Sequence, residues 1–134
     1  MNILLDTHIA LWAITDHPKL PEKAKELIMD PDNNIYYSAV SAWEVLLKHD
    51  SPRNNLTLTA EDFIAYCDEA GYIALNMKPR HIAAASKLDI SQAGKQHNDP
   101  FDRLLLSQAK AENFSFLTHD EKIALYNEKC VIAV

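Results

Sequence analysis

Cysteine is scarce in this 134-residue chain, which holds only Cys67 and Cys130. The two do not form a CxxC pair, and neither has a histidine partner in the sequence. We therefore expect both to be small, buried, apolar side chains. Glycine is equally scarce, with two residues, and Gly71 falls where a helix would end in a left-handed conformation.

Long apolar runs are also missing, since no segment approaches the roughly 20 apolar residues that cross a bilayer. The apolar run at 3–14 is interrupted by Asp6 and His8 and lacks a basic leader, so we expect a cytoplasmic protein with no membrane partner. The formal net charge of −6 argues against a general polyanion binder. Carboxylates that cluster around metal would inflate that value, and two divalent ions would bring it to about −2.

The pattern of apolar residues predicts an α/β fold. Short apolar runs at 2–5, 35–37, 72–75, 114–117 and 131–134 predict strands, and amphipathic helical segments separate them. Such an alternation is typical of a parallel sheet, here of four or five short strands, with helices on both faces. The length suits one domain, residues 1–134, and no repeat, low-complexity tract or linker divides it.

The most informative stretch is 97–120, which begins HNDPFDR and ends FLTHD. Asp99 is expected to N-cap a helix that starts at Pro100, with Asp102 in its first turn. That helix runs antiparallel to the strand after it, so it begins at the edge where this strand ends. Asp102 and Asp120 are therefore expected at the carboxyl edge of the sheet, where open α/β sheets place their sites.

Two further acids are expected at the same edge. Asp6 follows the first predicted strand, and Glu44 lies near the start of the predicted helix 38–48. Two ionised carboxylates about 4 Å apart repel by about 4 kcal/mol at an effective dielectric near 20, so a cluster requires protons or a cation. Oxygen ligands without cysteine or histidine spacing suit Mg²⁺ or Mn²⁺, not zinc. This predicts metal-assisted attack of water on a phosphodiester.

Each acid also has a purely structural interpretation. Asp6, Asp99 and Asp120 could each do no more than cap a helix. Glu44 could complete a capping box with the serine three residues before it. Asp102 could interact with the helix dipole alone. The expected convergence on one edge of the sheet is what favours a functional role.

Several basic and aromatic side chains near these acids could contact a substrate. His97, just before the acidic turn, is the preferred histidine for a substrate or supporting role. Lys48 lies one helical turn beyond the helix glutamate and could bind phosphate or pair with that glutamate. Arg103 could meet phosphate or face solvent. We expect Trp12 and Trp43 to be core or interface residues rather than platforms for base stacking.

Four motifs together resemble the PIN-domain family, and most closely the VapC-type toxins of bacterial toxin–antitoxin pairs. They are LLDTH at 4–8, SAVSAWEVLLK at 38–48, HNDPFDRLLLSQA at 97–109 and FLTHD at 116–120, and they span nearly the whole chain. The resemblance implies an α/β/α sandwich with strand order 3-2-1-4-5 and a Mg²⁺- or Mn²⁺-dependent endoribonuclease. It also implies a homodimer that is silenced by a cognate antitoxin, whose tail enters the acidic groove.

The resemblance assigns roles by position. It implies that the family's four acids are Asp6, Glu44, Asp102 and Asp120. Asp99 matches an additional acid of the DPFD-bearing members, and Thr7 and Thr118 match small hydroxyl residues that orient the acids. The chain departs from the pattern after Lys48, where related proteins often carry a short glycine-containing turn and this chain reads HDSPRNNLTL. The departure concerns the shape of the substrate groove and not the acids.

Other classes of protein fit the sequence less well. A phosphatase of the haloacid dehalogenase type needs a second aspartate two residues after the first, where this chain has His8. A response-regulator receiver needs an acid pair after strand one and a phosphoacceptor after strand three, and both are missing. The other open interpretation is a catalytically silent PIN fold that binds RNA or a partner protein, which the four intact acids disfavour.

Overall fold

The computed structural model describes residues 1–54, 56–89 and 99–134, and within these ranges the chain forms a five-stranded sheet of order β3-β2-β1-β4-β5. The strands are β1 (Asn2–Leu5), β2 (Asn34–Ser38), β3 (Ile73–Leu75), β4 (Ser115–Thr118) and β5 (Val131–Ala133). Every neighbouring pair is parallel. The predicted α/β fold and the strand order that the resemblance implied are both confirmed.

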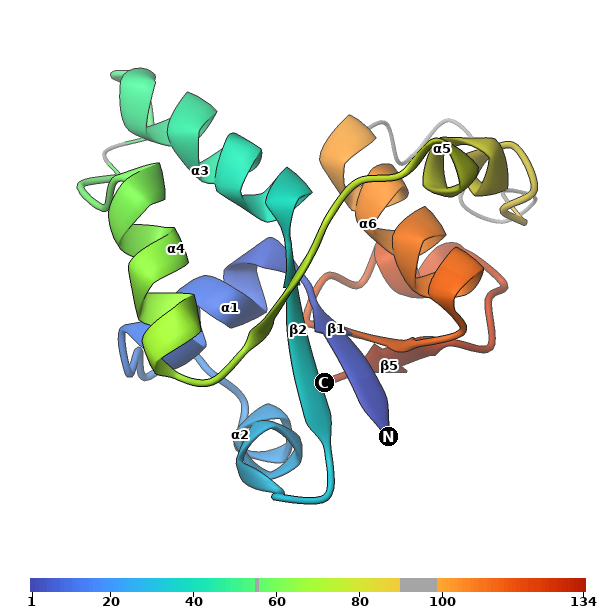
Figure 1. Cartoon of the computed structure of the whole chain (residues 1–134), viewed down its shortest axis with the longest axis horizontal. Coiled ribbons are helices and arrows are strands. Elements are labelled where there is room, and N and C mark those ends of the chain that lie inside the picture. Colours follow the sequence, from blue (N-terminus) through green and yellow to red (C-terminus); the bar gives the residue numbers. More distant parts are fainter. Residues whose placement is uncertain (55, 90–98) are drawn as a thin grey trace.

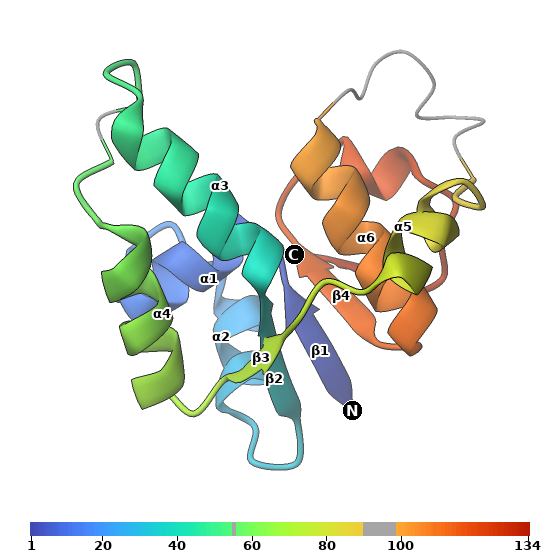
Figure 2. The same cartoon turned by 45° about the horizontal axis from the view of Figure 1, so that its top comes forward.

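Helices cover both faces of the sheet, as Figures 1 and 2 show. They are α1 (Thr7–Ile14), α2 (Glu22–Met29), α3 (Ala39–Asp50), α4 (Ala60–Glu69), α5 (Pro79–Ala85) and α6 (Pro100–Glu112), with a 3₁₀ turn η2 (Ile123–Leu125). Helices α1, α2 and α4 lie on one side, and α5 and α6 lie on the other. Within the described residues, no helix is long and apolar enough to cross a membrane.

The core is divided by the sheet into two apolar clusters, one on each face. Ile3 and Leu5 of β1 belong to the first cluster, whereas Leu4 belongs to the second, because successive side chains of a strand point to opposite faces. All three are fully buried, which explains why β1 is an uninterrupted apolar run. Helix α3 bridges the two clusters, since it contributes Val45 to the first and Val40 to the second.

Residues with positive φ follow α4 and α6, which lead into β3 and β4. Gly71 has φ +84° just after α4, as the sequence predicted, and Asn113 has φ 60° at the end of α6. Both angles lie in the left-handed region, which glycine and asparagine tolerate best. The turn at Asn113 sends the chain directly into β4, and so sets Asp102 and Asp120 at the same edge.

Some predictions need correction. No α-helix follows Asp120 in the described part of the chain, although one interpretation made this residue a helix cap, and the segment forms only the 3₁₀ turn η2. Trp43 is 55% exposed and is therefore not a core residue, and Cys130 is only partly buried, whereas Cys67 is fully buried. Nearly all of the predicted polar loop 89–98 lies outside the described residues, and so does His97.

The two-cluster core predicts which apolar side chains carry the stability. Leu106 of α6 is fully buried in the second cluster, whereas Ile82 of α5 is 58% exposed. Leu106→Ala should lower the free energy of unfolding by about 2–5 kcal/mol, because it leaves a cavity as well as removing buried apolar surface. Ile82→Ala is the matched control and should change it by less than about 1 kcal/mol. Urea denaturation of both variants measures the difference, and equal effects would contradict this core.

Candidate functional site

Asp6 occupies the carboxyl end of β1 and is 2% exposed. Its Oδ1 accepts the backbone N–H of Thr7 at 2.7 Å and so caps α1, as the structural interpretation expected. Its Oδ2 accepts the hydroxyl of Thr118, at the end of β4, at 2.7 Å. Asp6 is therefore held in one orientation by two strand ends, and capping uses only one of its oxygens.

Glu44 lies in the second turn of α3 and is 3% exposed. The N-cap of α3 is Ser38, whose Oγ accepts the N–H of Val40 at 3.0 Å. Ser41, in contrast, is hydrogen-bonded to Thr7 through its hydroxyl at 2.8 Å. The capping box between Ser41 and Glu44 is therefore not formed, and that structural explanation of the glutamate is wrong.

The two carboxylate oxygens of Glu44 have different environments. Oε2 forms an ion pair with Nζ of Lys48 at 2.8 Å, so the predicted pairing one turn along the helix is present. Oε1 is the one buried side-chain oxygen or nitrogen, within the part of the chain that the structure describes, without a hydrogen-bond partner. A buried acceptor without a partner is costly, and such an atom in a native protein indicates a ligand, an ion or a water.

The acidic turn before α6 folds as the sequence predicted. Oδ1 of Asp99 accepts the N–H groups of Phe101 and Asp102 at 2.9 and 3.3 Å, and Pro100 is the first residue of the helix. Asp102 follows in the first turn, where it is 8% exposed. Asp99 thus acts as a cap, and the cap directs the first turn of α6 toward the end of β1.

Electrostatics show that the acids converge. Burial, followed by the negative charges of Asp6, Asp99, Glu44 and Asp120, raises the pKa of Asp102 to about 8. Burial likewise raises the pKa of Asp6, with a further rise from Glu44, although the hydrogen bond from Thr118 opposes it. Acids from four separate parts of the chain therefore repel one another at a single edge of the sheet, which the spacing of the sequence predicted.

Thr118 connects two of the acids. Its hydroxyl donates to Asp6 and accepts the backbone N–H of Asp120 at 3.0 Å. The carboxylate of Asp120 accepts the N–H of Lys122 at 2.9 Å, which forms a tight turn rather than a helix cap. A cavity of about 260 Å³ opens beside these groups and is lined by Asp6, His8, Trp12, His119 and Asp120. We refer to it as the acidic cleft.

One predicted substrate-contacting residue is engaged elsewhere. Nη2 of Arg103 donates to the carbonyl of Ala85, at the end of α5, at 3.2 Å. This group of Arg103 therefore lies against α5.

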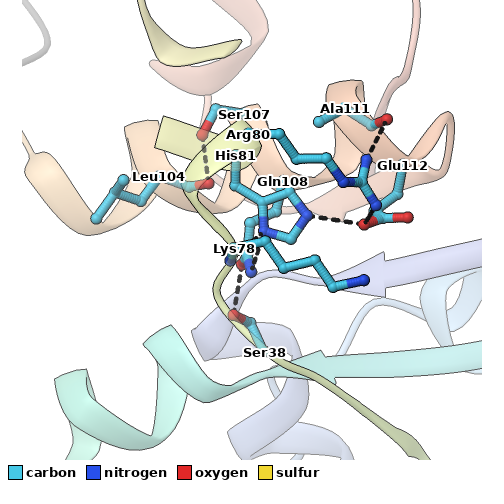
Figure 3. A network of polar contacts seen from close by, with 9 residues as sticks. All are labelled: Ser38, Lys78, Arg80, His81, Leu104, Ser107, Gln108, Ala111 and Glu112. Atoms are coloured by element: carbon cyan, nitrogen blue, oxygen red, sulfur yellow. Dashed lines mark hydrogen bonds and ion pairs between the residues drawn. The ribbon is translucent and has the colours of Figure 1, made fainter. Parts of the chain in front are cut away.

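A buried polar network, which the sequence did not predict, connects α3, α5 and α6 (Figure 3). The hydroxyl of Ser38 donates to Oε1 of Gln108 at 2.5 Å, and Nε2 of Gln108 lies 3.3 Å from Nδ1 of His81. All three side chains are fully buried. The network joins the first turn of α3, which leads to Glu44, to α6 and α5. The signal in the sequence was a pair of polar residues inside the apolar run LLLSQA of α6.

The outer end of this network orients the ring of His81. Its Nδ1 accepts the backbone N–H of Lys78 at 3.0 Å, so the hydrogen of a neutral ring is on Nε2 and is donated to Glu112 at 2.8 Å. Arg80 also forms an ion pair with Glu112. The hydrogen bond from His81, together with the Arg80 charge, lowers the pKa of Glu112 below its ordinary value.

The residues of the site suit a divalent cation in chemistry and in charge. Their donors are carboxylate oxygens, which Mg²⁺ and Mn²⁺ prefer. The unpartnered oxygen of Glu44 and the raised pKa values of Asp6 and Asp102 indicate negative charge without full compensation. Within residues 1–54, 56–89 and 99–134, no three histidine, cysteine, aspartate or glutamate side chains already form a metal-binding group. The site is therefore not a preformed ligand cage.

Comparison with known proteins agrees with this fold. The model of the family described as PIN domain matches residues 3–129. The structure is similar to VapBC2 from Rickettsia felis bound to a DNA fragment from its promoter, with a TM-score of 0.70 and 18% identity over 100% of this chain and 99% of that chain. It is also similar to DNA-bound VapBC from Salmonella typhimurium, with a TM-score of 0.68 and 12% identity over 99% and 98% of the two chains. No curated protein sequence matches the chain.

The lowered pKa of Glu112 predicts acid sensitivity at the outer end of the network. A carboxyl whose folded pKa lies below the unfolded value stabilises the protein above that unfolded value of 4.5, and the contribution is lost as pH falls. Glu112→Gln should therefore cost roughly 1 kcal/mol at pH 7 and less at pH 3. Chemical denaturation at both pH values measures this, with the exposed Glu26→Gln of α2 as control. A cost that does not change with pH would contradict the assignment.

Proposed function

Because this chain belongs to the PIN-domain family, we propose that it is a Mg²⁺- or Mn²⁺-dependent endoribonuclease and the toxin of a bacterial toxin–antitoxin pair. The observation that carries the proposal is that four other acids lie close enough to raise the pKa of the buried carboxyl of Asp102. They are Asp6, Asp99, Glu44 and Asp120. A protein that only bound RNA would gain nothing from negative charge gathered where the phosphates must approach. The same charges become favourable when a divalent cation lies between the protein and the phosphate.

The proposed partners follow from the same comparisons. The similar structures are VapBC complexes, which favours a cognate antitoxin that binds this chain and blocks its acidic cleft. We further propose that residues 1–134 form one domain, that the active form is a homodimer and that it acts in the cytoplasm. RNA is the proposed substrate.

The proposed roles of the acids follow from their surroundings. Asp6, Glu44, Asp102 and Asp120 would hold the cation. Thr118 and the N–H of Thr7 orient Asp6, so that its carboxylate does not rotate when a substrate arrives. Asp99 sets the first turn of α6 and so the position of Asp102.

When bound, the cation would supply Lewis-acid activation of water and stabilise the charge of the reacting phosphate. The carboxylates would keep the substrate phosphate at the cleft through that cation alone, because they repel the phosphate directly. Lys48 pairs with Glu44, so its ammonium group lies beside the acids and can approach a phosphate. Water as the nucleophile predicts products with 5′-phosphate and 3′-hydroxyl ends.

Asp6→Asn should abolish cleavage of RNA while the protein remains folded. Asparagine keeps an acceptor for the N–H of Thr7, and it removes a buried charge, so the melting temperature should equal or exceed that of the wild type. The rate of RNA cleavage in Mn²⁺ should fall by at least a hundredfold. It is measured on a panel of labelled RNAs, and reactions with EDTA define zero activity. Asp32→Asn, in the exposed turn after α2, is the matched control and should retain full activity.

Either of two results would contradict the proposed reaction. One is an Asp6→Asn protein that cleaves like the wild type. The other is RNA ends that carry 2′,3′-cyclic phosphate, which would make the ribose hydroxyl the nucleophile. Absence of cleavage by the wild type across the whole panel would instead favour the binding module.

Binding of the cation can be measured without activity. Mn²⁺ at a hundred times its dissociation constant should stabilise the wild type by about 2.7 kcal/mol, because the folded protein alone has the acids together. Thermal unfolding with and without Mn²⁺ measures the effect, and Asp102→Asn should reduce the gain. An equal gain in Asp102→Asn and in the wild type would place the cation elsewhere. Asp32→Asn again serves as the control.

A further inference from the structure

A second and larger cavity adjoins the acidic cleft. It has a volume of about 490 Å³ and shares His8 and Trp12 with the cleft as lining residues. It lies between α1, the end of α3 and the segment that leads to α4, where Lys48 and Leu58 also line it. A ligand that reaches the acids can therefore extend into this cavity without leaving the surface. We refer to it as the α1 pocket.

Trp12 is held at the junction of the two cavities by histidine rings. His17 stacks on it with ring centroids 6.1 Å apart and an interplanar angle of 26°, and His8 lies 6.0 Å away. His119 contacts its edge at 5.7 Å in a T-shaped arrangement. These contacts fix the indole, so a flat ligand that packs against it loses little side-chain entropy from the protein.

The lining of the α1 pocket combines an aromatic surface with positive charge. Leu11, Trp12 and Leu58 supply apolar contact, and Thr15 and His17 supply polar groups. Among the described residues that line either cavity, Lys48 is the one lysine or arginine. Its ammonium group forms an ion pair with Glu44, so Lys48 connects the lining of the pocket to one of the acids. Because the formal net charge of the chain is −6, a lysine at this position supplies a local attraction for an anionic ligand.

We propose that the α1 pocket binds one unpaired nucleotide of the RNA, next to the phosphate that is cleaved. The base packs against Trp12, and Lys48 contacts a phosphate of that nucleotide. The proposal rests on the proposed function and adds a subsite for the base, which must be unpaired because a paired base cannot enter the pocket without loss of stacking. Trp12 also packs against the first apolar cluster, as the sequence predicted, and the proposal adds a ligand contact to that role.

Two observations favour a nucleotide over a peptide as the occupant. First, the α1 pocket shares His8 and Trp12 with the acidic cleft, whose lining includes Asp6 and Asp120, so an RNA strand in the cleft would lie next to the pocket. Second, the combination of aromatic ring and single cation matches a base with its phosphate, since bases stack on aromatic side chains irrespective of their sequence. The volume also lies within the range of small-ligand sites.

Kinetics on single-stranded RNA in Mn²⁺ test the subsite. Trp12→Ala should raise KM by about tenfold and change kcat by less than about twofold, because base stacking contributes to binding and not to the chemical step. Trp12→Phe keeps an aromatic ring and should restore most of the affinity. Trp43→Ala is the matched control, since Trp43 is exposed on α3 and lines neither cavity, and its KM should equal that of the wild type.

Fluorescence tests the contact directly, because the chain has two tryptophans. In Trp43→Phe protein the signal comes from Trp12 alone, and adenosine 5′-monophosphate should quench it. Ribose 5-phosphate, which lacks the base, should quench it much less. Trp12→Phe protein, which retains Trp43, should show no change with either compound. Adenosine monophosphate contains no phosphodiester bond, so the measurement does not depend on cleavage.

The outcomes separate the two proposals. An unchanged KM in Trp12→Ala together with unquenched Trp12 overturns the subsite and leaves the nuclease proposal intact. Quenching of Trp12 in Trp43→Phe protein, together with no cleavage of RNA by the wild type, supports the subsite and contradicts the nuclease. Unchanged RNA kinetics in Trp12→Ala with weakened inhibition by an antitoxin would show that a protein segment occupies the pocket, which also overturns the nucleotide proposal. If Trp12→Ala does not fold, the fluorescence of the intact tryptophan decides.

Discussion

The structure depends on the burial of carboxylates near one another at the carboxyl edge of a parallel sheet. Asp6 and Asp102 are almost fully covered, and the pKa of each is raised by burial and by neighbouring acids. Lys48 pairs with Glu44 alone, and so offsets only part of the negative charge. The cost of this arrangement is met by the rest of the fold, whose two apolar clusters hold the strand ends together against the repulsion.

The supports around the acids are hydrogen bonds between elements that are distant in sequence. Thr118 joins the end of β4 to that of β1, and Thr7 joins α1 to Ser41 of α3. Deeper in the protein, Gln108 joins α6 to the N-terminus of α3. Because these groups are buried, a missing partner would leave an unsatisfied donor or acceptor, which makes the geometry of the edge specific. Such rigid supports are needed at this site, because the charges of the acids repel one another.

The acidic cleft and the surface beside it differ in charge. An RNA strand would meet repulsion at the cleft and attraction beside it, where Lys48 and the rings around Trp12 line the α1 pocket. In the proposed mechanism, the reaction takes place at the acids, and the α1 pocket contributes a large part of the affinity for RNA. Both regions are built on α1, whose first turn is capped by Asp6 itself, so a change at this residue affects the cleft and its neighbour together.

The sequence by itself determined the alternation of strands and helices, the helix cap at Asp99 and the location of four acids at strand ends or helix starts. These features are local, because apolar periodicity and capping depend on residues a few positions apart. Only the tertiary structure decided that Ser38, and not Ser41, caps α3, that Gln108 links α6 to that cap, and that Trp12 borders a pocket while Trp43 is exposed. An apolar helical run looks the same whether a face meets the sheet, a cavity or solvent. That choice is made by contacts between segments far apart in the chain, which no local pattern records.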